Sequence, residues 1–317
     1  MFFFNYLKNN LFYFLIVAFF FISSFSISLI PKVKYVNGQL KDSYEFEVSK
    51  LPVLKNTDGI PVLSAQGVFA FDLDSAVVLY EKNPDLLLFP ASTTKIITAL
   101  VAMDHYADQE VLNTGNVSVS GQKMGLECNE NISVNDLLYG LLIHSANDAA
   151  EVLAQNHPEG RALFIDEMNS KAKEFYAWST TFKNPSGLDE EGQLTSARDL
   201  ARIATKAMQN QEFASIVATK EYVAKSDDGK IVHYLSNRNE LLGKVNGVLG
   251  IKTGWTENAR ENLVTYVERD EKHIILALLG SQDRFGETEE LVEWIFSNYD
   301  WLAIDQEHLS ALRRNSR

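Results

Sequence analysis

The sequence predicts an α+β fold in which an antiparallel sheet is flanked by helices. Three observations lead to this prediction. Short apolar runs typical of strands occur near the start of the folded part, segments with helical periodicity fill its middle, and strand-like runs return in its last third before a final helix. Strands from both ends of the chain would therefore share one sheet, with the helices packed against it.

Two segments of different composition precede the first strands. Residues 1–31 are predicted to be a membrane anchor or a signal sequence, because residues 9–31 carry no charge and about 20 apolar residues can cross a bilayer. A small–x–small step at Ser24 would permit cleavage, but residues 25–30 stay apolar, so we expect an uncleaved anchor that attaches the protein to the membrane. Residues 32–64 mix charged residues, Asn, Gly and Pro without a sustained period and are predicted to be a linker.

A folded domain is expected at residues 65–302, followed by a tail at 303–317. It begins with two predicted strands, at 67–73 and 76–80, which a tight turn joins into a hairpin. The next predicted element is a helix at 93–106. This helix is apolar nearly all round, so we expect it to be buried in the centre of the domain.

Capping patterns mark the starts of two further helices. Ser133 is followed by Asp136, and Ser196 by Asp199, each just before an apolar periodic segment. The remaining predicted elements are helices at 147–155, 159–175 and about 287–301, a turn-rich loop at 184–189, and strands at 221–225, 250–255, 262–268 and 273–279.

Composition excludes several classes of function. The formal net charge of −13 over 317 residues argues against a nucleic-acid partner, because phosphate binding needs a basic surface. The single cysteine, Cys128, excludes an internal disulfide and a CxxC metal or redox site. The histidines show no ligand spacing such as HxxxH, and no nucleotide-binding motif occurs, so we expect no metal and no cofactor.

The candidate nucleophile is Ser92, which lies with Lys95 at the start of the predicted buried helix. Residues three apart lie on one helical face, so the lysine amine can reach the serine hydroxyl. A serine hydroxyl needs a neighbouring base before it becomes a good nucleophile. Lysine can act as that base when burial or a second cation destabilises its ammonium form, and Lys252 is the candidate second cation.

Two further motifs complete the predicted site. Ser145-Ala146-Asn147 offers a hydroxyl that can relay a proton to the leaving group and an amide that can bind the substrate. Lys252-Thr253-Gly254 is the only Lys-Thr-Gly triplet and is predicted to be a strand that holds an acyl substrate. The backbone N–H groups of Ser92 and Trp255 would bind the developing oxyanion, at about 3 kcal/mol per donor.

Each motif is weak by itself. A second SxxK occurs at 120–123, where no buried apolar helix begins, and a second SxN occurs at 133–135, where the serine already caps a helix. Taken alone, Ser92 predicts a helix cap, Ser145 a loop, and the Lys-Thr-Gly triplet a strand with a bulge. The order and wide spacing of the three motifs favour a single shared site.

The chain resembles the serine D-alanyl-D-alanine carboxypeptidases, the low-molecular-weight penicillin-binding proteins, which carry this trio of motifs. The resemblance extends over about 67–301. Beyond the trio it rests on Pro90-Ala91, 137–143, 148–150, Met168-Asn169, 184–188 and 196–201. It implies a β-lactamase/transpeptidase-like catalytic domain at 65–302, in which a helical subdomain accompanies the sheet.

The resemblance also implies an activity. Such an enzyme removes the terminal D-alanine from peptidoglycan stem peptides through an acyl-enzyme on Ser92 and is acylated by β-lactams. Lys95 would be the base and Ser145 the relay, while Asn147 and Lys252 would hold the substrate and its charge. The implied location is the bacterial cell envelope, with the catalytic domain outside the cytoplasmic membrane.

Arg238 is implied as a substrate-binding residue. Asn237-Arg238-Asn239 resembles the family segment whose arginine helps to hold the terminal carboxylate of the substrate, and Thr253 would assist it. A guanidinium suits this task because it pairs with carboxylates in a bidentate manner. Trp255 fills a position that varies in the family, and its bulk would narrow the cleft.

Other functions stay open. A D,D-endopeptidase that cuts peptidoglycan cross-links would use the same residues, and a non-catalytic muropeptide or β-lactam sensor would be acylated without turnover. A class A β-lactamase is disfavoured, because no Glu-x-x-x-Asn sequence lies between Asn147 and Lys252. A Ser-His-Asp triad built on His144 is also disfavoured, because adjacent helical residues point apart.

Overall fold

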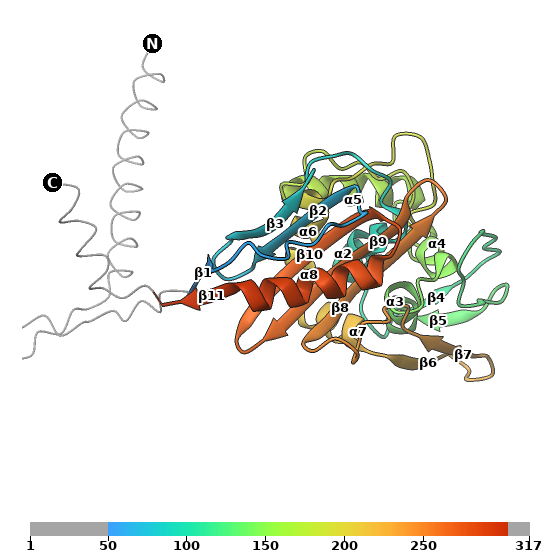
Figure 1. The fold of residues 1–317 in the computed structure, drawn as a ribbon. Helices are drawn as coiled ribbons and strands as arrows, with labels where there is room; N and C mark the ends of the chain where they lie inside the picture. The colour runs from blue at the N-terminus through green and yellow to red at the C-terminus, as the bar shows by residue number, and fades with distance from the viewer. Residues whose placement is uncertain (1–49, 304–317) are drawn as a thin grey trace, which may run out of the picture. The chain divides into compact units, whose positions relative to one another are not determined.

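A five-stranded antiparallel sheet forms the centre of the protein, as seen in a computed structural model that describes residues 50–303 (Figure 1). The strand order is β3-β2-β10-β9-β8. The bounds are β2 (Gly67–Asp72), β3 (Val78–Lys82), β8 (Val248–Thr256), β9 (Arg260–Arg269) and β10 (Lys272–Ser281). Since β2 and β3 precede the helical part and β8 to β10 follow it, the predicted α+β fold with a sheet built from both ends is confirmed.

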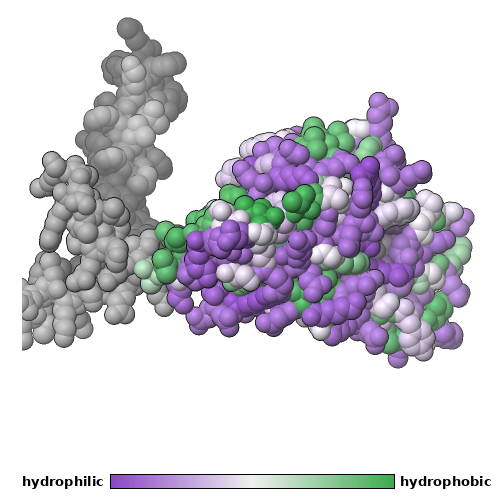
Figure 2. Space-filling view, in the orientation of Figure 1, coloured by the Kyte–Doolittle hydropathy of each residue, from purple (hydrophilic) through white to green (hydrophobic). Residues whose placement is uncertain are grey.

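Both faces of this sheet are covered, and β10 shows this most clearly. Side chains alternate between the faces of a strand. Ile274, Leu276 and Leu278 belong to the apolar cluster beneath α8 (Arg284–Asn298), whereas Ile275, Ala277 and Leu279 belong to the cluster beneath the other helices. The outer face of the domain that is visible in Figure 2 is mainly hydrophilic, with apolar residues in small patches. The core is therefore divided into two layers by the sheet.

Between the two groups of strands lie the predicted helices in the predicted order, together with α7, which was not predicted. Their bounds are α2 (Lys95–His105), α3 (Val134–Leu142), α4 (Asn147–Gln155), α5 (Arg161–Glu174), α6 (Ala197–Met208) and α7 (Gln211–Ala218), and the short 3-10 helix η2 (Ala91–Thr94) precedes α2. The hydroxyls of Ser133 and Ser196 accept the N–H groups of Asp136 and Asp199, which confirms both predicted caps. The predicted central helix is buried from Lys95 to Ala102.

Two small hairpins lie beside α3, at the end of the helical region away from β3 (Figure 1). One pairs β4 (Val111–Asn113) with β5 (Asn131–Ser133), and the other pairs β6 (Glu221–Lys225) with β7 (Val232–Ser236). Together with the helices they form the lobe that faces β8 across the site described below.

Two predicted boundaries are wrong. Part of the predicted linker 32–64 is the strand β1 (Leu51–Leu54), which pairs with β11 (Tyr299–Leu302). The last helix therefore ends at Asn298 and does not continue to 301. These two four-residue strands come from opposite ends of the domain, so neither sequence segment contains the partner that makes it a strand.

The predicted anchor at 1–31, the first part of the linker and all but the first residue of the tail at 303–317 lie outside the described residues. Among residues 50–303, none of the helices combines the length and the apolar character that a membrane crossing requires.

Candidate active site

The structure brings the three sequence motifs together where η2 approaches β8. The Asn262 side chain on β9 donates hydrogen bonds to the carbonyls of Phe89 and Pro90, at 2.9 and 3.0 Å, and so fixes η2 against the sheet. The approach is so close that a Cβ on Gly254 would lie 3.1 Å from the backbone nitrogen of Ser92. A side chain at this position would press against η2, so the glycine of the Lys-Thr-Gly motif suits the close passage of β8 beside the candidate nucleophile.

Lys95 lies beneath Ser92 and is fully buried. Its Nζ lies 2.9 Å from Ser92 Oγ, 2.7 Å from Asn147 Oδ1 and 2.5 Å from the carbonyl oxygen of Ser186. Burial lowers the pKa of Lys95 to about 7, although the carboxylates of Asp148 and Glu151 oppose this shift. A substantial fraction of this amine is therefore uncharged at neutral pH and can accept the serine proton.

Lys252 and Ser145 form a second hydrogen-bonded pair in the site. Lys252 is buried, and its Nζ donates to Ser145 Oγ at 2.9 Å and to the Thr253 carbonyl at 3.0 Å. Burial, followed by the positive charge of Lys95, lowers the pKa of Lys252 well below its ordinary value. The charge of Lys95 therefore acts on Lys252, whereas the lowered pKa of Lys95 is caused by burial and not by the predicted second cation.

Ser145 occupies an unusual backbone conformation between α3 and α4, with φ at 65°. A non-glycine residue in this left-handed region costs of order 1–3 kcal/mol and is tolerated where the surrounding structure imposes it. Here the conformation places the hydroxyl against Lys252. His144 does not join this group, since its ring contacts the side chain of Gln122 and the backbone N–H of Ser236.

Asn147 is the first residue of α4 and connects two parts of the site. Its Oδ1 accepts from Lys95, and its Nδ2 donates to the Ser120 carbonyl at 2.8 Å. Its backbone N–H donates to the Gln122 carbonyl. The rejected SxxK at 120–123 therefore contributes backbone to the wall of the site, a role for which its sequence gave no signal. One N–H of the Asn147 amide remains for a substrate.

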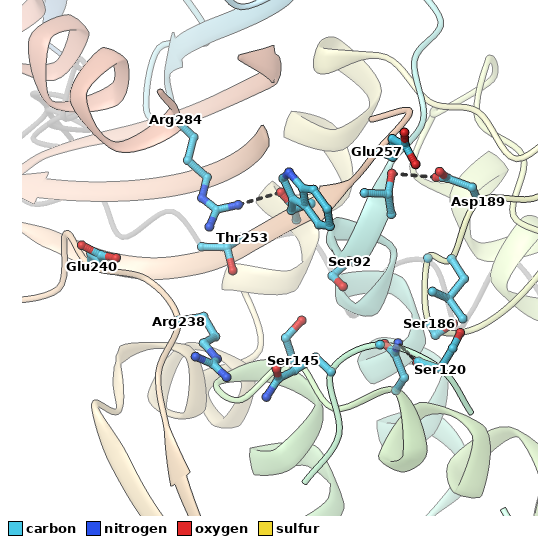
Figure 3. A pocket seen from close by; sticks show the side chains of 18 residues that line it. Ser92, Ser120, Ser145, Ser186, Asp189, Arg238, Glu240, Thr253, Glu257 and Arg284 are labelled. Atoms are coloured by element: carbon cyan, nitrogen blue, oxygen red, sulfur yellow. Dashed lines mark hydrogen bonds between the residues drawn. The ribbon is translucent and has the colours of Figure 1, made fainter. Parts of the chain in front are cut away.

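A cleft of about 890 Å³ opens above Ser92 (Figure 3). Figure 3 shows Arg238 and Thr253 on one side of Ser92, and Ser186 and Asp189 on the other. Trp255 also lines the cleft but is 63% exposed, so its bulk stands at the rim. All nine predicted site residues except the buried Lys95 and Lys252 line this cleft, and these two lie directly beneath its floor.

The cleft also contains a cationic residue that the sequence analysis missed. Arg284, the first residue of α8, donates from Nη1 to the Gly254 carbonyl at 2.9 Å and lines the cleft together with Arg238. Nothing in the local sequence around Arg284 indicates this role, because only the fold brings α8 to the end of β8. The two guanidiniums and the Thr253 hydroxyl give one side of the cleft the character of a carboxylate-binding site.

Comparison with known proteins identifies the family of this chain. Residues 55–283 match the D-alanyl-D-alanine carboxypeptidase family. The D-alanyl-D-alanine carboxypeptidase DacF of Bacillus subtilis is 32% identical over 247 residues, which cover 74% of this chain and 63% of that protein. The chain thus spans less than two thirds of the length of this relative.

Solved structures give the same result. A D-alanyl-D-alanine carboxypeptidase of Mycobacterium tuberculosis superimposes with a TM-score of 0.73 at 30% identity, over 80% of this chain and 98% of that one. A DD-transpeptidase of Streptomyces superimposes with a TM-score of 0.71 at 28% identity, over 75% of this chain and 98% of that one. The chain belongs to the D-alanyl-D-alanine carboxypeptidase family.

Proposed function

We propose that this protein is a serine D,D-carboxypeptidase of the bacterial cell envelope, which removes the terminal D-alanine from peptidoglycan stem peptides. The observation that carries the proposal is the 2.9 Å contact between Ser92 Oγ and the buried Lys95 amine at the floor of the cleft. A serine beside an amine with a pKa of about 7 is activated for acyl transfer at neutral pH.

The first half of the reaction forms the acyl-enzyme. Uncharged Lys95 takes the proton of Ser92 as the serine oxygen attacks the carbonyl carbon of the penultimate D-alanine. The oxyanion that forms is expected to be bound by the backbone N–H groups of Ser92 and Trp255. The Ser145 hydroxyl, held by Lys252, then relays this proton: it receives a proton from Lys95 and gives its own to the nitrogen of the leaving D-alanine as the peptide bond breaks, so Lys95 is uncharged again.

The second half releases the peptide. A water molecule loses a proton to the basic amine and attacks the acyl carbonyl, and the Ser92 oxygen leaves with a proton. β-Lactams would enter the same path as substrate mimics and acylate Ser92. Arg238, Arg284 and Thr253 would hold the carboxylate of the leaving residue, so the enzyme should prefer a peptide with a free C-terminus.

Product analysis tests this proposal. The purified full-length chain is incubated with a peptide that ends in D-alanyl-D-alanine, and free D-alanine is measured. The carboxypeptidase releases D-alanine from this peptide, whereas an endopeptidase cleaves a cross-linked muropeptide dimer faster. A sensor would bind fluorescent penicillin without releasing any product. Ser92→Ala serves as the control, and persistent labelling of that variant would refute the nucleophile.

Attachment to the membrane through residues 1–31 is part of the same proposal. The uncharged segment 9–31 supports it, since this length of apolar chain can cross a bilayer. Fractionation of cells that express the chain with and without residues 1–31 provides the test. We expect only the longer form in the membrane fraction after a high-salt wash, and recovery of the longer form in the soluble fraction would contradict the anchor.

A further inference from the structure

A second cluster of polar side chains lies at the opposite end of the two helices that carry the site. His105 is the last residue of α2, His157 follows the C-terminal end of α4, and Glu167 lies on α5. Each side chain offers one ligand atom, and these atoms all lie within 4.8 Å of one another. The three residues come from separate helices, so their sequence spacing gives no sign of the cluster.

The His157 imidazole distinguishes this cluster from an ordinary surface contact. His157 is 5% exposed, and its Nε2 finds no hydrogen-bond partner within residues 50–303. Leaving a buried polar atom unpaired is costly, so such atoms are rare in folded proteins and call for an explanation. Nε2 lies 3.6 Å from Glu167 Oε2, which is too long for a hydrogen bond but suitable for two atoms that share a metal ion.

We propose that His105, His157 and Glu167 form a zinc site. Two imidazole nitrogens and one carboxylate oxygen are a ligand set that zinc prefers, with water in the fourth position. Metal–ligand bonds of about 2.0–2.1 Å in a tetrahedral site place neighbouring ligand atoms roughly 3.3–3.4 Å apart. The present 3.6 Å between His157 and Glu167 is close to that separation.

The remaining pair, His105 and Glu167, can separate to admit the ion. His105 Nε2 and Glu167 Oε2 are in direct contact, and their side chains are 31% and 34% exposed. Zinc would replace the proton that this contact shares, and the exposed side of the pair would leave the fourth position open to water. Binding would therefore need a movement of two partly exposed side chains, while buried His157 keeps its place.

The surrounding charges also suit a dication. The C-terminal end of α2 presents the negative end of its helix dipole to the cluster. Lys171, one turn beyond Glu167, is paired with Asp104 and so does not compete for the carboxylate. When zinc binds Nε2 of His157, the proton of the neutral ring lies on Nδ1. Nδ1 then no longer accepts the backbone N–H of Glu159, a contact that is already long at 3.4 Å.

Thermal unfolding of the full-length chain tests the proposal. The protein is stripped with a chelator, dialysed, and heated with zinc chloride, with magnesium chloride or with neither. At a zinc concentration about a hundredfold above the dissociation constant, we expect Tm to rise by about 5–10 °C and one zinc ion to be bound per chain. Magnesium should produce no shift, and an equal shift with magnesium would count against a site built on two imidazoles.

Matched variants locate the site. Glu167→Gln and His105→Asn alter partly exposed side chains and leave the buried His157 intact, so both variants should fold. The control is His273→Asn, which alters a histidine on the sheet that has its own carboxylate partner, Asp74. We expect the zinc shift to be lost in the first two variants and retained in the control. No shift in the parent chain, or a shift that persists in Glu167→Gln and His105→Asn, would overturn the proposal.

Discussion

The two ends of α2 and α4 hold buried polar groups in opposite ways. At the N-terminal ends, the Lys95 amine contacts three acceptors that fix its position, and burial lowers its pKa to about 7. At the C-terminal ends, the His157 ring is also enclosed, but its Nε2 lacks a partner among the described residues. Burial alone therefore does not define a function. The number of satisfied hydrogen bonds separates a group held for proton transfer from one that is open to a ligand.

Replacing Lys95 with methionine should have the largest effect on catalysis. The loss of the general base is expected to slow acylation of Ser92 by about 10²–10⁴-fold. Stability should change little, because relief of the desolvation of a buried amine offsets the hydrogen bonds lost by Asn147 and Ser186. The rate is measured with a fluorescent penicillin, and stability by thermal unfolding.

Lys123 offers a matched control, because it is the exposed lysine of the second SxxK sequence. Lys123→Met should leave the acylation rate unchanged. Equal slowing in Lys123→Met and Lys95→Met would mean that the contact between Lys95 and Ser92 is not what activates the serine.

Replacing Arg238 with alanine should affect substrate binding rather than chemistry. Loss of one charge-assisted hydrogen bond, about 1.5–3 kcal/mol, corresponds to a rise of roughly 10–100-fold in KM for a peptide with a free C-terminal carboxylate. The same peptide with a C-terminal amide should show little difference between parent and variant. Lys230→Ala, which removes an exposed cation outside the cleft, is the control. A drop in kcat with both peptides would instead assign Arg238 a role in positioning the catalytic groups.

The pH dependence of acylation gives a smaller and more specific effect. Because burial lowers the pKa of Lys95 to about 7, the amine is protonated and inactive below that pH and becomes a base above it. We expect kcat/KM for acylation to rise about tenfold per pH unit below 7 and then to level off. Rates measured from pH 5 to 9 provide the test, and a rate that still rises about tenfold per unit up to pH 9, as expected for an exposed lysine with a pKa near 10, would show that burial does not control this proton.

Most of the fold could be predicted from the sequence, because helix caps and helical periodicity depend on residues that are close together along the chain. The caps at Ser133 and Ser196 and the buried helix after Ser92 have clear periodicity, and the structure contains all three. The pairing of β1 with β11 was missed because each strand has four residues and its partner lies at the other end of the domain. The helix α7 was also missed, because its eight residues form little more than two turns and are too few for a clear periodic pattern.

The active-site cleft and the histidine cluster also differ in how far the sequence predicts them. The residues of the cleft could be grouped from the sequence alone because three motifs occur in a fixed order. Arg284 belongs to no motif, and its place in the cleft follows only from the packing of α8 against β8. The cluster of His105, His157 and Glu167 had no motif at all. Its members are brought together by the ends of three packed helices, and no local pattern encodes that arrangement.

Removal of zinc should have the smallest effect on catalysis, and it tests whether the two ends of α2 are independent. Lys95 and His105 are the first and last residues of α2, and the ten steps between them separate them by about 15 Å at 1.5 Å per residue. A helix that is packed along this length should keep its catalytic end in place when the metal leaves. We expect a chelator to lower Tm while acylation of Ser92 at 25 °C stays within about twofold of the zinc-loaded protein. Glu167→Gln should show the lower Tm without a chelator, and a parallel loss of acylation in that variant would mean that the cluster also positions the catalytic residues.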